Sequence, residues 1–85
     1  MNYETRTVRI WIDNLEADYF AVRELTLAAD DVGDLADRLA EWHRDRAPEL
    51  TGVWSDLLRA ALNGVNWYEL AELYWESHRD EDSDK

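Results

Sequence analysis

The chain has 85 residues, which is enough for one small domain. Twenty Asp and Glu against nine Lys and Arg give a formal net charge of −11, which excludes direct nucleic-acid binding because such binding requires basic side chains that contact phosphates. The hydrophobic fraction of 46% and five Trp exclude a disordered acidic chain, and the lack of Cys excludes disulfides and thiolate sites.

The N-terminal segment 3–12 has the alternating pattern of a β-strand. Val8, Ile10 and Ile12 fall on one side of an extended chain, whereas polar residues and Trp11 fall on the other. A lone strand leaves backbone donors unpaired, so it must pair with a second extended segment or with the same strand of another copy. The latter alternative predicts a homodimer through the N-terminal strand.

Helical periodicity follows the strand. The first helix is expected after an N-cap at Asp13–Asn14, with an apolar stripe that ends at Ala29. The second begins after a cap at Asp30–Asp31 and runs to about Arg46, because Pro48 cannot continue a helix. These two segments are the first two predicted helices.

Two more helices are expected in the second half. The third has an apolar stripe that starts at Val53, and we expect Gly64 to end it in the left-handed conformation. The fourth starts at Asn66, which forms a capping-box pair with Glu69. The sequence thus predicts an α+β, mostly α fold: an N-terminal β-strand followed by about four helices.

The expected domain organisation is simple. One acidic, mostly helical domain spans residues 1–78, and residues 79–85 form a disordered acidic tail because no apolar residue follows Trp75. No run is long enough to span a membrane, and the polar start lacks the features of a signal peptide. Together with the lack of Cys, this predicts a cytoplasmic protein that does not bind membranes.

Catalytic and metal-binding patterns are not found in the sequence. The only histidines are His43 and His78 and the only lysine is Lys85, and none lies in a motif for nucleophilic catalysis or metal binding. Three scattered Gly residues form no phosphate-binding loop. We therefore expect no enzyme activity, no catalytic residues, no cofactor and no metal; an enzyme or metal protein is the third alternative.

Two predicted helices carry rows of carboxylates. In each row the later members follow the first at offsets of three, seven and eleven residues, so each row lies on one helix face with about one turn (~5.4 Å) between members. DNA phosphates recur at a comparable interval. The rows are Asp34, Asp37, Glu41 and Asp45, and Glu69, Glu72, Glu76 and Asp80. They predict an acidic DNA mimic; the alternative is an ordinary acidic surface of a protein from a halophilic or GC-rich source.

Tryptophan offers a second kind of binding site. Trp11, Trp54 and Trp75 lie off or at the margins of the predicted apolar stripes, and an exposed Trp beside carboxylates is typical of a binding hot spot. These residues favour the second functional alternative, a non-catalytic protein–protein interaction or assembly module. In that alternative the acidic surface only secures solubility.

The stretch from Thr51 to Glu72, with Trp11-Ile12-Asp13-Asn14 upstream, resembles small acidic proteins encoded by phages and other mobile elements. Its residues follow the pattern DLL-x-x-AL-x-x-V-x-W-x-E-x-A, and the resemblance covers most of residues 8–76. The resemblance implies a setting among anti-defence factors, including anti-CRISPR and anti-restriction proteins that occupy DNA-binding surfaces of host complexes.

The leading hypothesis combines the resemblance with the acidic rows. It is a phage- or mobile-element-derived inhibitor of a bacterial defence complex, an anti-CRISPR-like DNA mimic in the cytoplasm of the host cell. Its partner is a basic DNA-binding surface of a host protein or complex, whose Arg and Lys side chains would meet the carboxylates through charge-assisted hydrogen bonds.

Overall fold

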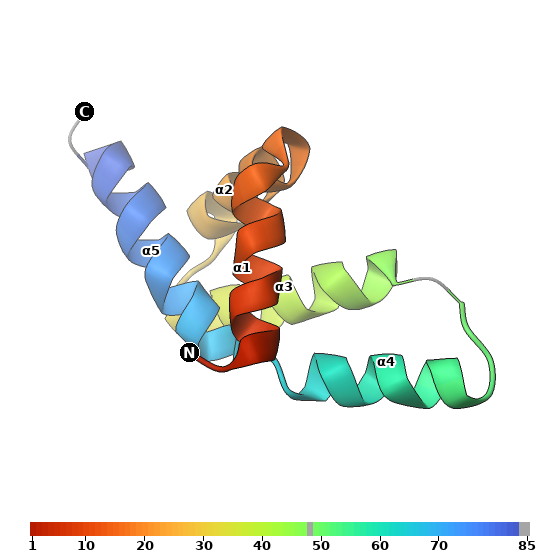
Figure 1. Cartoon of the computed structure of the whole chain (residues 1–85). Coiled ribbons are helices and arrows are strands. Elements are labelled where there is room, and N and C mark those ends of the chain that lie inside the picture. The colour runs from red at the N-terminus through yellow and green to blue at the C-terminus, as the bar shows by residue number, and fades with distance from the viewer. Residues whose placement is uncertain (48, 84–85) are drawn as a thin grey trace.

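The computed structural model describes residues 1–47 and 49–83, with the backbone alone for 80–83. The described residues form five helices and no strand (Figure 1). The helices are α1 (Tyr3–Asn14), α2 (Glu16–Ala28), α3 (Val32–Arg46), α4 (Val53–Asn63) and α5 (Trp67–Ser83). The described part of the chain is therefore all-α, and the predicted α+β fold with an N-terminal strand is wrong. The four predicted helices correspond to α2–α5.

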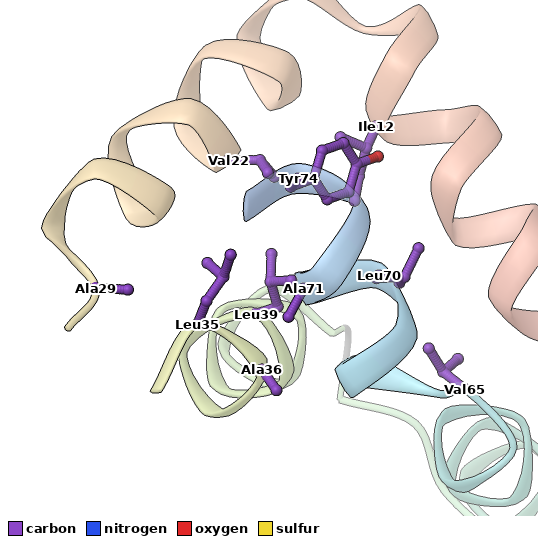
Figure 2. Packing of buried hydrophobic residues seen from close by; sticks show 10 residues of the cluster. All are labelled: Ile12, Val22, Ala29, Leu35, Ala36, Leu39, Val65, Leu70, Ala71 and Tyr74. Atoms are coloured by element: carbon purple, nitrogen blue, oxygen red, sulfur yellow. The ribbon is translucent and has the colours of Figure 1, made fainter. Parts of the chain in front are cut away.

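The core lies where α3 and α5 pack against each other. Leu35 and Leu39 of α3 and Leu70 and Ala71 of α5 are completely buried. Figure 2 shows Leu39 and Ala71 between the two helices, whereas Leu70 points away from α3. α5 also packs against α1 and α2, and α2 packs against α1 and α3. The core cluster consists of Ile12, Val22, Ala29, Leu35, Ala36, Leu39, Val65, Leu70, Ala71 and Tyr74.

The segment predicted as a strand is helix α1. Asn2 caps it, because its side-chain oxygen accepts a hydrogen bond from the backbone N–H of Thr5 at 2.9 Å. Thr5 and Ile12 are buried and Val8 is half-buried, so the inward positions follow helical spacing. Ile10, which completed the period-two pattern, is 50% exposed. Without a strand in the described residues, the homodimer through a strand edge loses its basis.

Two predicted helix boundaries are also corrected. Asn14 ends α1 and donates its side-chain amide to the Ile10 carbonyl, so α2 begins after Leu15, which makes no side-chain cap bond. Gly64 adopts right-handed backbone angles, with φ −80°, and not the left-handed conformation. A Cβ at Gly64 would lie 3.3 Å from the Glu4 side chain, so glycine here permits the close approach of α1.

The predicted start of α5 at Asn66 is confirmed, but the predicted capping box is not complete, because the Asn66 backbone N–H is bonded to Thr5 and not to the Glu69 side chain. The Asn66 side chain accepts a hydrogen bond from the Glu69 backbone N–H at 3.0 Å. The Asn66 backbone N–H donates to the Thr5 hydroxyl at 2.8 Å, and the Asn2 amide donates to the Gly64 carbonyl at 2.6 Å. These long-range bonds fasten the N-terminus of α1 to the α4–α5 junction.

The C-terminal part of α5 includes most of the residues that were predicted to form an acidic tail. The helical backbone continues through Ser83, His78 is buried, and the Arg79 guanidinium donates to the Ala29 carbonyl at 2.6 Å. Residues 84–85 lie outside the described residues, so the predicted disorder of 79–85 stays a prediction. No helix in the described ranges is long and apolar enough to cross a membrane.

Helix α4 lies apart from the core. None of its residues is buried, and among the described residues it takes no part in the close helix–helix packing that joins α1, α2, α3 and α5. Figure 1 shows α4 beyond the packed helices, at the end of the connection from α3. The chain is consequently elongated, with principal extents of 49 × 22 × 22 Å.

Replacement of the α1 cap tests the helical assignment of the N-terminal segment. We expect Asn2→Ala to lower the free energy of unfolding by about 1–2 kcal/mol, because it removes the cap and the bond to Gly64. Urea unfolding followed by circular dichroism gives this value. An unchanged stability would contradict the cap, and Asn14→Ala serves as a control at the other end of α1.

A pair of leucine substitutions tests the position of the core. Leu39→Ala should destabilise the chain by about 2–5 kcal/mol, because it leaves a cavity between α3 and α5. Leu50→Ala, at an exposed leucine outside the helices, should change stability by less than about 0.5 kcal/mol. Equal losses for the two variants in urea unfolding would contradict this core.

Candidate partner-binding surface

The α3 acidic row (Asp34, Asp37, Glu41 and Asp45) is partly neutralised within the chain. The Asp34 carboxylate accepts bonds from the Asp30 backbone N–H and the Arg38 guanidinium, both at 3.0 Å. These two interactions hold the pKa of Asp34 below its ordinary value, despite some desolvation. The other three members are exposed. Asp34 thus helps to define the start of α3, and only part of the row is free to meet a partner.

The α5 acidic row (Glu69, Glu72, Glu76 and Asp80) borders α1. Glu69 is half-buried and lies 4.0 Å from the amino group of Met1, whereas Glu72 and Glu76 are exposed. All three line a shallow hollow with Arg9 of α1. The side chain of Asp80 lies outside the described residues. The described members therefore form one acidic strip with a single arginine at its border.

The two acidic rows do not form one surface. At 3.6 residues per turn, each row lies roughly opposite the buried face of its own helix. Since α3 and α5 pack through their buried faces, the two rows point away from each other. The hollow along the α5 row contains no residue of α3, and the hollows beside Asp37, Glu41 and Asp45 contain no α5 carboxylate.

The three candidate tryptophans have different surroundings. Trp11 on α1 is 62% exposed and Trp54 on α4 is 66% exposed. Trp75 is half-buried against the core, and the Arg79 guanidinium lies 4.4 Å from its ring centroid. Trp11 and Trp54 are therefore available to a partner, whereas Trp75 has its place at the border of the core.

The larger apolar feature is on α4. Successive residues turn by about 100°, so the apolar side chains of α4 cover about half of its circumference, and the polar ones share the other half. This α4 apolar face consists of Val53, Trp54, Leu57, Leu58, Ala61 and Leu62. None of these side chains is buried, and Val53, Trp54 and Leu57 are each more than half exposed. An apolar face of this extent is typical of an interaction surface.

A groove separates α4 from the packed helices. Trp11 of α1 and Leu15, the residue between α1 and α2, line one wall, and Leu58 and Leu62 of α4 line the other. The lining is completed by Asp18, His43, Arg46 and Ala47. Arg46 and Asp18 form an ion pair at 3.1 Å, so the charges beside this α1–α4 groove balance each other. The groove therefore combines apolar walls with a locally neutral border.

His43 also lines the α1–α4 groove. Its ring stacks on Trp67 with centroids 5.2 Å apart and meets Trp42 edge-on. Its buried Nε2 atom has no hydrogen-bond partner among the described residues. Burial and the neighbouring Arg46 charge lower the pKa of His43, although Asp18 opposes the shift. His43 is consequently a neutral aromatic packing residue near pH 7.

The described side chains contain no metal-binding cluster. Within residues 1–47 and 49–79, no three His, Asp or Glu side chains lie close enough together to hold a metal ion. Tyr74 hydrogen-bonds the Asp13 carboxylate at 3.0 Å, and burial together with that carboxylate raises the pKa of its hydroxyl. The arrangement of Tyr74 stabilises the fold and leaves the phenol in its neutral form.

Comparison of the chain with protein-family models, curated proteins and solved structures gives no match.

The sequence indicated the exposed tryptophans but not the surface to which they belong. A period of 3.6 identifies the apolar stripe of α4, but a stripe looks the same whether the helix is buried or exposed. One available signal is charge. α4 contains one Asp and one Arg and is formally neutral, in a chain whose net charge is −11. A neutral amphipathic helix in a strongly acidic chain is a pointer to an apolar contact surface.

The lowered pKa of His43 predicts how stability depends on pH. Because the folded-state pKa lies below the ordinary 6.5, the unfolded chain binds a proton first as pH falls, so stability decreases as pH falls below about 6.5. His43→Phe should flatten this decrease between pH 7 and 5, as measured by urea unfolding. Identical pH profiles would contradict the assignment; both proteins retain His78, which controls for the second histidine.

Proposed function

We propose that the chain is a non-catalytic protein-interaction module that binds another protein chain through the α4 apolar face and Trp11. The observation that carries this proposal is that α4, an amphipathic helix with six apolar positions on one face, has no buried residue. Covering such a face contributes roughly 25 cal/mol for each Å² of apolar surface removed from water, which is the main driving force of most protein association. We place this activity in the cytoplasm.

The acidic surface has a supporting part in this proposal. The carboxylates of α3 and α5 surround the molecule with negative charge, which limits contacts through faces other than α4. A partner that binds the α4 apolar face meets aromatic and aliphatic side chains, and Trp is the residue type most enriched in interface hot spots. Exposed Trp54 and Trp11 are therefore the residues on which binding should depend most.

Capture of partners from bacterial lysate tests the proposal. A tagged wild-type chain should retain its partner at high salt, because apolar contacts are not screened by ions. Leu57→Ser should lose the partner without loss of helical circular dichroism, since Leu57 is 55% exposed. Glu72→Lys with Glu76→Lys is the matched control and should retain it. Loss with the control variant, but not with Leu57→Ser, would contradict the proposal.

A second candidate is the anti-CRISPR-like DNA mimic, acting through one acidic row. The observation that favours it is the α5 row, where exposed Glu72 and Glu76 have no arginine within 4.0 Å among the ion pairs of the described residues. The mimic would use this row alone, since the α3 row points elsewhere. Its partner, a basic DNA-binding surface, would be released by moderate salt and displaced by duplex DNA.

A further inference from the structure

We infer that two copies of this chain pair through α4 about a two-fold axis, with Trp54 of each copy seated in the α1–α4 groove of the other. The inference rests on the proposed function and names the partner of the same surface. Two-fold pairing requires a patch that is complementary to itself. Two properties of the α4 surface meet this requirement: its register and its charge.

The apolar positions of α4 are symmetric about the midpoint between Leu57 and Leu58. In an antiparallel pair centred there, Val53 lies opposite Leu62 of the other copy. Trp54 likewise lies opposite Ala61, so the largest side chain meets the smallest. Both helices present ridges of residues four apart, which is the commonest mode of helix packing. The α4 apolar face is therefore complementary to itself in shape.

In this register, the Trp54 indole of one copy lies at the α1–α4 groove of the other copy. Ala61 is flanked by Leu58 and Leu62, which form the α4 wall of the groove. The groove has a volume of about 330 Å³, which gives room for an indole ring. Trp11 stands on the opposite wall and is 62% exposed, so an inserted Trp54 would gain an aromatic neighbour.

Charge also favours a second copy over an unlike partner. The two charged residues of α4, Asp56 and Arg59, have opposite signs and lie on its polar half, away from the α4 apolar face. The face that would pair carries no charge. A surface shaped for a basic partner would be bordered by unpaired acid, yet the groove is bordered by the Asp18–Arg46 pair. Two copies, each with a net charge of −11, meet here with least repulsion.

Sedimentation of the full chain over a range of concentrations tests the inference. We expect a monomer–dimer equilibrium that tightens as salt rises, because salt screens the repulsion between acidic copies. Trp54→Ala should raise the dimer dissociation constant at least about 30-fold. Tyr68→Ala removes another exposed aromatic side chain, on α5, and should leave the dimer dissociation constant unchanged. A wild-type chain that stays monomeric, or a dimer unaffected by Trp54→Ala, would overturn the inference.

A cross-linking experiment keeps the test decisive if Trp54→Ala unfolds. The chain has no Cys, so a single introduced cysteine reports one contact. Residue 57 lies beside the proposed axis, so a short bismaleimide should join two Leu57→Cys chains. Two Ala17→Cys chains should not be joined, although Ala17 is an exposed residue of α2. Cross-linking at Ala17→Cys alone would overturn this interface. A monomer that still captures a partner dependent on Leu57 refutes the dimer and leaves the proposed function standing.

Discussion

The contact between α3 and α5 determines how every other surface of this chain is presented. Leu35 and Leu39 meet Leu70 and Ala71 without solvent exposure, and each fully buried leucine contributes about 1.5–3 kcal/mol. Once these faces are fixed, helical geometry directs the opposite faces outward. The carboxylates on those outer faces are therefore separated by the core itself. A single extended acidic surface made of both rows is incompatible with this packing.

The same core explains why α4 remains uncovered. α1, α2, α3 and α5 bury their apolar residues against one another, and Val65 marks the last core contact before α5 begins. α4 is fixed at its C-terminal end by the Asn2–Gly64 bond, but its apolar face extends past the packed helices. The result is a molecule with two kinds of surface: acidic on α3 and α5, and apolar and neutral on α4.

Local signals in the sequence were reliable where one short-range interaction decides the structure. Asp31 and Asn66 cap their helices as expected, because a cap depends on a side chain and the backbone three residues later. The strand prediction failed because Val8 and Ile12 satisfy both a period of two and a period of 3.6. Exposure of α4 was not predictable, since it depends on which faces the remaining helices fill. The acidic rows were placed correctly on helices, but their divergence follows from tertiary packing alone.

The position of α5 in the core makes the whole fold depend on the last helix of the described chain. α5 packs against α1, α2 and α3, yet it is synthesised after all of them. While α1–α3 emerge from the ribosome, Leu35 and Leu39 have no α5 to cover them, so the nascent chain exposes its most apolar residues. The core is incomplete until Leu70 and Tyr74 are present. A chain shortened before α5 would consequently be a substrate for chaperones and proteases instead of a smaller version of the fold.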